Sequence, residues 1–273
     1  MKIFIKDYKR SIIVSILCFV SFFSLNEVLT EKRYELFYFF SVLLSFLFLL
    51  LIYFDHVTNV KKYNQKQIFS LEKSYYLQHI LNHYVVPVTL YLFSLLFIFL
   101  NNNFPLKIVI FFIVSVSLLI CLINVRSYFL NKLTLEHSTH SIYDGMKLIG
   151  FFLASNALLH IYFNGSINIF FELIFLAVVT IIGIGLIFVR SGLYSKDIAL
   201  TVILSSIIIT LLAFLSIKVL NLTLVQTNIG LLTLFYFIVA VIHHKIEGTL
   251  TKKIVVNYLM FSLIIIALMY GMR

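Results

Sequence analysis

Apolar residues along this chain form long runs of about 20 positions, separated by short polar segments. A helix of about 20 apolar residues is long enough to cross the hydrocarbon core of a bilayer. Nine such runs can be drawn, and they predict an all-α fold: a polytopic bundle of about nine transmembrane helices. The expected spans are 11–28, 34–54, 83–101, 105–129, 146–163, 167–189, 197–220, 225–243 and 253–271.

The first run is the least regular, because Asn26 and Glu27 cut it short. It follows a basic N-terminal segment, as the core of a signal peptide does, but no small-residue cleavage site comes after it. We therefore interpret 11–28 as a retained extra helix that precedes a core of spans over 34–271. The whole chain, 1–273, is expected to form a single integral membrane domain.

Composition agrees with a membrane protein. The chain is 62% hydrophobic and 12% charged, with a mean hydropathy of +1.06, whereas soluble domains are about half apolar and about a quarter charged. The net charge of +10 does not indicate nucleic-acid binding, because no basic segment is free of a span. Cys18 and Cys121 lie inside apolar runs, so we expect buried thiols without a disulfide.

The positive charges instead predict how the chain is oriented in the membrane. Sixteen of the 21 Lys and Arg residues fall on one side of the expected bundle and five on the other. Because Lys and Arg concentrate in cytoplasmic connections, the N-terminus is expected inside and, with nine spans, the C-terminus outside. The high content of Ile, Phe, Asn, Lys and Tyr is typical of AT-rich prokaryotic genomes, which favours a prokaryotic plasma membrane.

Histidine is the residue type that most favours a functional site here, because seven of the eight lie at expected cytoplasmic ends of spans. In a first cluster His79 and His83 are four residues apart, so they would share one face of a helix. Two imidazoles at this spacing can bind one zinc-like ion. The simpler alternative is an interfacial helix that meets lipid headgroups.

A second cluster precedes the fifth span. Glu136, His140 and Asp144 recur every four residues and form one helical stripe, with His137 beside it. Carboxylates and imidazoles are ligands for divalent metal ions. The alternative is capping of the helix together with one interhelical hydrogen bond.

A third cluster ends the eighth span. Glu247 lies three residues after His244 and four after His243, so it can share a helical face with both. An ordinary charged helix end is the alternative for this cluster. The chain has no phosphate-binding glycine loop, nucleophile elbow, paired-cysteine zinc site or Ser–His–acid constellation, so enzyme activity is not favoured.

Few polar residues lie within the spans themselves. Asn156 and His160, four residues apart in the fifth span, are candidate pore-lining residues, because polar side chains inside a bilayer usually face the bundle interior. Glu172, near the outer end of the sixth span, is interpreted as interfacial. Gly183 and Gly185 are interpreted as positions of close helix packing.

Two segments resemble the ZIP family of divalent-metal transporters. Residues 139–146 (THSIYDGM) are similar to that family's H-N-x-x-D-G-L/M motif, and residues 235–248 are similar to its F-L-Y-I/V-A-L-V-x-x-L-P-E stretch. The resemblance covers about a tenth of the chain. It implies that His140 and Asp144 bind the transported metal and that Ser141 occupies the Asn position. The sixth span has no histidine, although the family carries a second metal motif on its next helix.

Three functions follow from these patterns. The first is a ZIP-like transporter of a divalent metal ion, zinc or iron, with its site at the cytoplasmic mouth of the fifth span. The second is a membrane metalloenzyme whose histidine clusters resemble those of desaturases and hydroxylases, although no H-x-x-H-H box is present. The third is a structural or assembly subunit without a site of its own. The expected partners are the lipid bilayer and a metal ion.

Overall fold

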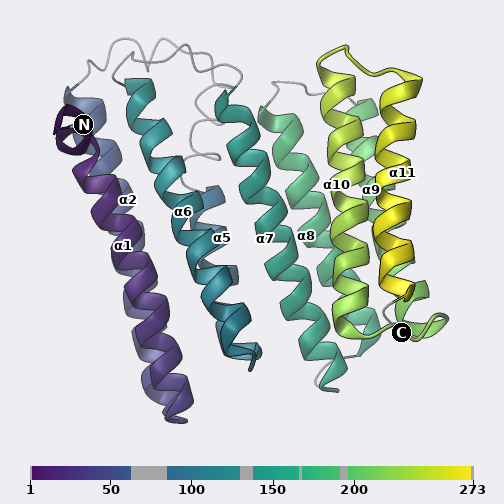
Figure 1. The fold of residues 1–273 in the computed structure, drawn as a ribbon, viewed down its shortest axis with the longest axis horizontal. Helices are drawn as coiled ribbons and strands as arrows, with labels where there is room; N and C mark the ends of the chain where they lie inside the picture. Colours follow the sequence, from purple (N-terminus) through teal and green to yellow (C-terminus); the bar gives the residue numbers. More distant parts are fainter. Residues whose placement is uncertain (1, 63–84, 130–137, 166–167, 191–195, 272–273) are drawn as a thin grey trace. The chain divides into compact units, whose positions relative to one another are not determined.

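The computed structural model describes residues 2–62, 85–129, 138–165, 168–190 and 196–271 (Figure 1). Within these ranges the chain forms nine helices and no strand, which confirms the all-α prediction. Each helix coincides with one of the predicted apolar runs. In chain order they are α1 (Lys2–Thr30), α2 (Tyr34–Lys62), α5 (Val86–Leu100), α6 (Phe104–Phe129), α7 (Ser138–Phe163), α8 (Ile169–Arg190), α9 (Lys196–Lys218), α10 (Leu224–Ile246) and α11 (Lys252–Gly271).

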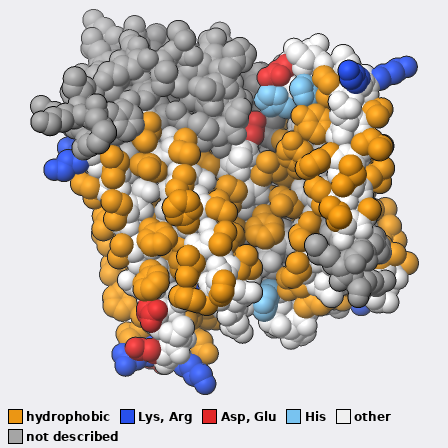
Figure 2. All heavy atoms as spheres, in the orientation of Figure 1, with side chains coloured by type: hydrophobic (Ala, Val, Ile, Leu, Met, Phe, Trp, Pro, Cys, Tyr) orange, Lys and Arg blue, Asp and Glu red, His pale blue; other side chains and the backbone are white. Residues whose placement is uncertain are grey.

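Six of these helices are long and apolar enough to cross a membrane, which fits an integral membrane protein. The count of nine spans, the orientation of the termini and the prokaryotic source stay predictions. Apolar side chains cover the visible surface of the helices, while charged side chains gather near helix ends (Figure 2). The six apolar segments are Lys9–Thr30, Phe104–Ile123, Asp144–Phe163, Ile169–Leu186, Ile198–Lys218 and Leu224–Ile246.

The chain divides into two compact units, Met1–Gly150 and Phe151–Arg273, which we call unit 1 and unit 2. Unit 1 contains α1, α2, α5, α6 and the first half of α7. Unit 2 contains the second half of α7 and α8 to α11. The prediction of a single domain over the whole chain stays a prediction.

Aromatic stacking forms the core of unit 1. The ring of Phe22 on α1 stacks on Tyr91 of α5 and on Phe111 of α6, with centroids 5.1 and 5.5 Å apart. Tyr91 also stacks on Phe48 of α2 at 4.5 Å. These side chains are nearly or fully buried, so the stacked rings link α1 directly to α5 and α6, and through Tyr91 to α2. Cys18 and Cys121 are both buried, which confirms the burial predicted for them.

A hydrogen bond between side chains also connects two helices of unit 1 in its interior. Lys107 Nζ, in the first turn of α6, donates to Asn26 Oδ1 on α1 across 2.9 Å. Lys107 is 6% exposed and Asn26 is 1% exposed. The polar break that Asn26 makes in the first apolar run therefore has a structural role as the acceptor for a buried ammonium group.

Close packing around one ring joins three helices of unit 2. Phe235 of α10 stacks on Phe151 of α7 with ring centroids 4.0 Å apart. On α8, a Cβ atom added to Gly183 would lie 3.0 Å from Phe235 Cζ, which is a tight contact, so glycine allows this ring to pack closely against the helix. The close packing predicted at Gly183 is confirmed. At Gly185 it is wrong, because an added Cβ there would meet no atom within 4 Å.

Candidate functional site

Four of the predicted metal ligands lie outside the described residues, and a fifth has no described side chain. His140 lies in the first turn of α7, but its side chain is outside the described part of the structure. The metal site therefore stays a prediction. The four ligands outside the described residues are His79, His83, Glu136 and His137.

Asp144 is described, and its carboxylate is paired. Lys147 Nζ, three residues further along α7, donates to Asp144 Oδ1 across 3.4 Å. The side chain of Lys147 is 3% exposed and that of Asp144 is 12% exposed. A metal ion that used this carboxylate would have to compete with a buried ammonium group.

The histidine pair at the end of α10 divides between two sets of partners. His243 Nδ1 lies 3.3 Å from Glu247 Oε1, as the spacing of four residues predicts. His244 instead contacts two hydroxyl groups: its Nδ1 lies 2.8 Å from Thr249 Oγ1 and its Nε2 lies 3.3 Å from the hydroxyl of Tyr258 on α11. Across the described residues, no three His, Cys, Asp or Glu side chains come together as a metal site.

The two candidate pore-lining residues of α7 differ in their surroundings. Asn156 is 5% exposed. His160 is half-buried one turn further on, and its Nδ1 lies 2.9 Å from Nδ2 of the exposed Asn164. Pore lining by either residue stays a prediction.

A buried polar pair joins α7 to α10 inside unit 2. Ser155 Oγ donates to Asn228 Oδ1 across 2.6 Å, and Asn228 Nδ2 donates to the carbonyl oxygen of Phe152 at 3.5 Å. Ser155 is fully buried and Asn228 is 1% exposed. Asn228 is seven residues, or about two turns, before Phe235 on the same face of α10. The polar pair therefore lies next to the Phe151–Phe235 stack.

Glu172 is the most unusual side chain of unit 2. It is the fourth residue of α8 and is 1% exposed, yet neither carboxylate oxygen has a hydrogen-bond partner among the described residues. Its side chain therefore faces the interior of the unit, while its position at the membrane interface stays a prediction. Glu172 lies 11 residues before Gly183, and 11 residues are three turns plus about 20°. It consequently shares the face of α8 that packs against α10.

A second buried polar atom without a partner lies on α10. Thr227 is 1% exposed, and its Oγ1 has no hydrogen-bond partner within the described parts of the chain. Helices α8 and α10 run in the same direction (Figure 1). Measured back from the Gly183–Phe235 contact, Glu172 lies about 16 Å and Thr227 about 12 Å along their helices. Measured along the helix axes, the carboxylate of Glu172 and the hydroxyl of Thr227 are therefore within about one turn of each other. Both lie near the first residues of their helices.

Sequence reasoning concentrated on histidine and missed this region, although a signal was present. Glu172 is the one acidic residue in the apolar run 167–189. It is also spaced four residues from Leu176 and eight from Thr180, which are both buried. A search for carboxylates on the buried stripe of a span would have selected it.

Comparisons of the chain with protein-family models, with curated proteins and with solved structures found no match. The ZIP resemblance therefore rests on the two sequence segments alone.

Proposed function

We propose that the protein is a membrane transporter that binds a cation at Glu172 and moves it through the interior of unit 2. The supporting observation is a carboxylate that is 1% exposed and unpartnered among the described residues, inside a helix able to cross a membrane. A buried carboxylate without a counter-charge costs several kcal/mol. Ionisable groups at such positions typically mark paths for ions or protons.

The first turn of α8 prepares this carboxylate to bind a cation. Asn168 Oδ1 accepts from the backbone N–H of Phe170, and the N–H of Glu172 donates to the carbonyl oxygen of Asn168. The carboxylate lies near the positive end of the helix dipole, which favours its charged form. Burial opposes the same charge, and a bound cation removes this conflict by neutralising the site.

The other buried polar groups of α7 and α10 favour cations that prefer oxygen ligands. Besides Glu172, the hydroxyl of Thr227 and the Ser155–Asn228 pair provide only oxygen and amide groups, which suit hard cations. Two turns beyond Asn228 on α10, Phe235 stacks on Phe151 of α7. We propose that these rings separate when the cation passes.

A divalent metal ion is the specific cation that the ZIP resemblance implies. In that form of the proposal, His140 and Asp144 bind zinc or iron at the start of α7, and the metal displaces Lys147 from Asp144. Loss of metal uptake in both His140→Ala and Asp144→Ala would support this form. Unchanged metal uptake in both variants would contradict it.

Flux into proteoliposomes tests the central claim. Protons, Na⁺ and divalent metal ions are supplied one at a time to vesicles that contain the wild type, Glu172→Gln or Glu35→Gln. Glu35 is the matched control, since it is exposed in the first turn of α2 and its change removes the same charge. We expect at least about a tenfold loss of flux, equivalent to about 1.4 kcal/mol, in Glu172→Gln alone.

Binding can be followed separately from transport. Hydrophobic carbodiimides modify protonated carboxyl groups in apolar surroundings, so we expect mass spectrometry to find Glu172 labelled and Glu35 unlabelled. The transported cation should protect Glu172 from labelling. Wild-type flux in Glu172→Gln would contradict the proposal. Flux of no cation in the wild type would favour an assembly role, and stoichiometric bound iron without flux would favour the metalloenzyme.

A further inference from the structure

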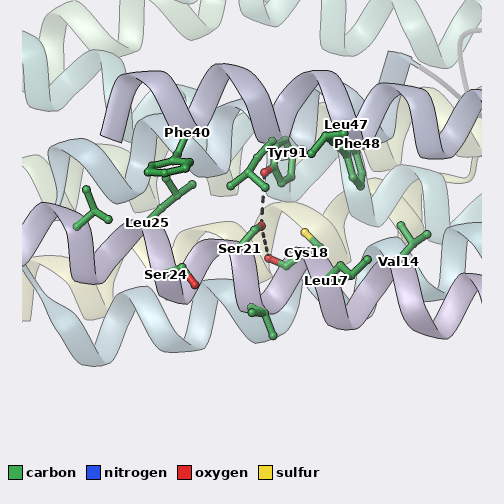
Figure 3. A pocket seen from close by; sticks show the side chains of 13 residues that line it. Val14, Leu17, Cys18, Ser21, Ser24, Leu25, Phe40, Leu47, Phe48 and Tyr91 are labelled. Carbon is green, nitrogen blue, oxygen red and sulfur yellow. Dashed lines mark hydrogen bonds between the residues drawn. The ribbon is translucent and has the colours of Figure 1, made fainter. Parts of the chain in front are cut away.

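Unit 1 contains a cavity of about 400 Å³ between α1, α2 and α5 (Figure 3). Its floor is formed by buried side chains: Cys18 is 3% exposed, Phe48 is 5% and Tyr91 is 2%. Its rim includes Leu17 and Leu47, which are 50% and 44% exposed. The cavity is thus open at its rim and closed by packed side chains at its floor.

The lining residues of α1 lie within its apolar segment, so when α1 crosses a bilayer the mouth of the cavity faces hydrocarbon. The lining residues of α1 extend from Val14 to Val28, inside the apolar segment Lys9–Thr30. At a rise of about 1.5 Å per residue, this stretch is about 21 Å long. One leaflet contributes about 15 Å of hydrocarbon. The cavity is therefore long enough for one lipid chain, and any occupant must enter from within the bilayer.

The lining is mostly apolar, which disfavours water and ions and favours hydrocarbon. The few polar groups are turned towards one another: Ser21 Oγ donates to the carbonyl oxygen of Cys18 at 2.7 Å and lies 3.5 Å from the Tyr91 hydroxyl. The flat face of Tyr91 is fixed by its stacking on Phe48. The remaining lining side chains are aliphatic or aromatic, apart from Ser24.

We propose that this cavity binds one hydrocarbon chain of a membrane lipid as a resident part of unit 1. An empty apolar cavity loses the dispersion contacts of its walls, and an inserted chain restores them. The volume lies within the range of about 300–1,000 Å³ that is typical of ligand pockets. This proposal does not depend on cation transport, because its residues and those of the Glu172 site belong to different units.

The absence of tryptophan from the chain makes a direct test available. Three variants each carry one tryptophan: Phe48→Trp on the cavity floor, Phe46→Trp on the exposed surface, and Phe111→Trp in the core. Phe46 is 59% exposed and Phe111 is fully buried. Fluorescence of the full-length protein is compared in phospholipid vesicles with and without bromine on the acyl chains, since bromine quenches tryptophan at short range.

We expect strong quenching at position 46, little at 111, and quenching at 48 that is at least about half of that at 46. Equally weak quenching at positions 48 and 111 would overturn the proposal, because the cavity would then be empty or filled by protein. Unquenched, red-shifted emission at 48 would also overturn it, because water would then fill the cavity. Circular dichroism checks that each variant is folded.

A second measurement uses no tryptophan. Leu44 lines the cavity, whereas Leu43 is 41% exposed and does not line it. Leu44→Phe should narrow the cavity, and Leu43→Phe adds the same bulk outside it. Native mass spectrometry of the purified protein should show a retained lipid in the wild type and in Leu43→Phe, and at least about a twofold lower occupancy in Leu44→Phe. Equal occupancy in all three proteins would overturn the proposal.

Discussion

Lys107 in unit 1 and Glu172 in unit 2 occupy the same position in their helices but differ in their partners. Each is the fourth residue of an apolar helix, and the backbone N–H of each donates to the carbonyl oxygen of an asparagine four residues earlier. Both side chains are buried. Lys107 donates to Asn26, whereas the carboxylate of Glu172 has no partner among the described residues.

The helix dipole explains why the buried lysine needs a partner and the buried glutamate does not. The N-terminal end of a helix disfavours a positive side chain and favours a negative one. Lys107 therefore needs the amide oxygen of Asn26, and the pair serves to hold α1 against α6. Glu172 has a favourable backbone environment and no hydrogen-bond partner among the described residues, and this is the basis for proposing that its charge is available to a ligand. The two buried charged residues thus differ in their surroundings rather than in their place along a helix.

The largest change in stability is expected when the hydrogen bond between Lys107 and Asn26 in unit 1 is removed. In Asn26→Leu, Lys107 loses its acceptor while it stays buried, so we expect the protein to lose about 3 kcal/mol of stability. Thermal unfolding in detergent measures this loss. The double variant Asn26→Leu, Lys107→Met should recover most of it, because no buried charge remains. If the double variant is as unstable as Asn26→Leu, the hydrogen bond is not the cause.

A gain in stability, rather than a loss, is expected when the buried carboxylate of Glu172 in unit 2 is replaced. Glu172→Gln removes a buried charge and keeps the side-chain shape, so stability in neutral buffer should rise by about 2 kcal/mol. The same unfolding experiment checks this, with Glu35→Gln as an exposed control that should not change. A fall in stability would show that Glu172 has a structural partner, as Lys107 does.

The smallest change in stability is expected where Gly183 packs against the Phe151–Phe235 stack. Gly183→Ala places a methyl group 3.0 Å from the Phe235 ring, which Phe151 holds from another side. We expect a loss of about 1–2 kcal/mol from overpacking. Gly185→Ala meets no atom within 4 Å and should be neutral or slightly stabilising. Equal stability of the two variants would show that the ring can move freely.

The cluster that ends α10 shows how far sequence reasoning reaches. The His243–Glu247 contact was predictable, because residues four apart on one helix are neighbours whatever surrounds the helix. The partners of His244 were not, since Tyr258 lies on α11, and only the packing of two helices brings these side chains together. Glu247 was predicted to be shared by both histidines; in the structure it contacts His243, whereas His244 contacts Thr249 and Tyr258.

The sequence by itself determined the membrane class and the places of the helices, because the length and apolar character of a run are local properties of the chain. The tertiary structure decided which polar residues are paired. Asn26 and Lys107 are 81 residues apart, and the burial of Glu172 depends on which face of α8 packs against α10. Contacts between distant segments depend on the mutual rotation and depth of the helices, and a one-dimensional hydrophobic pattern does not specify either.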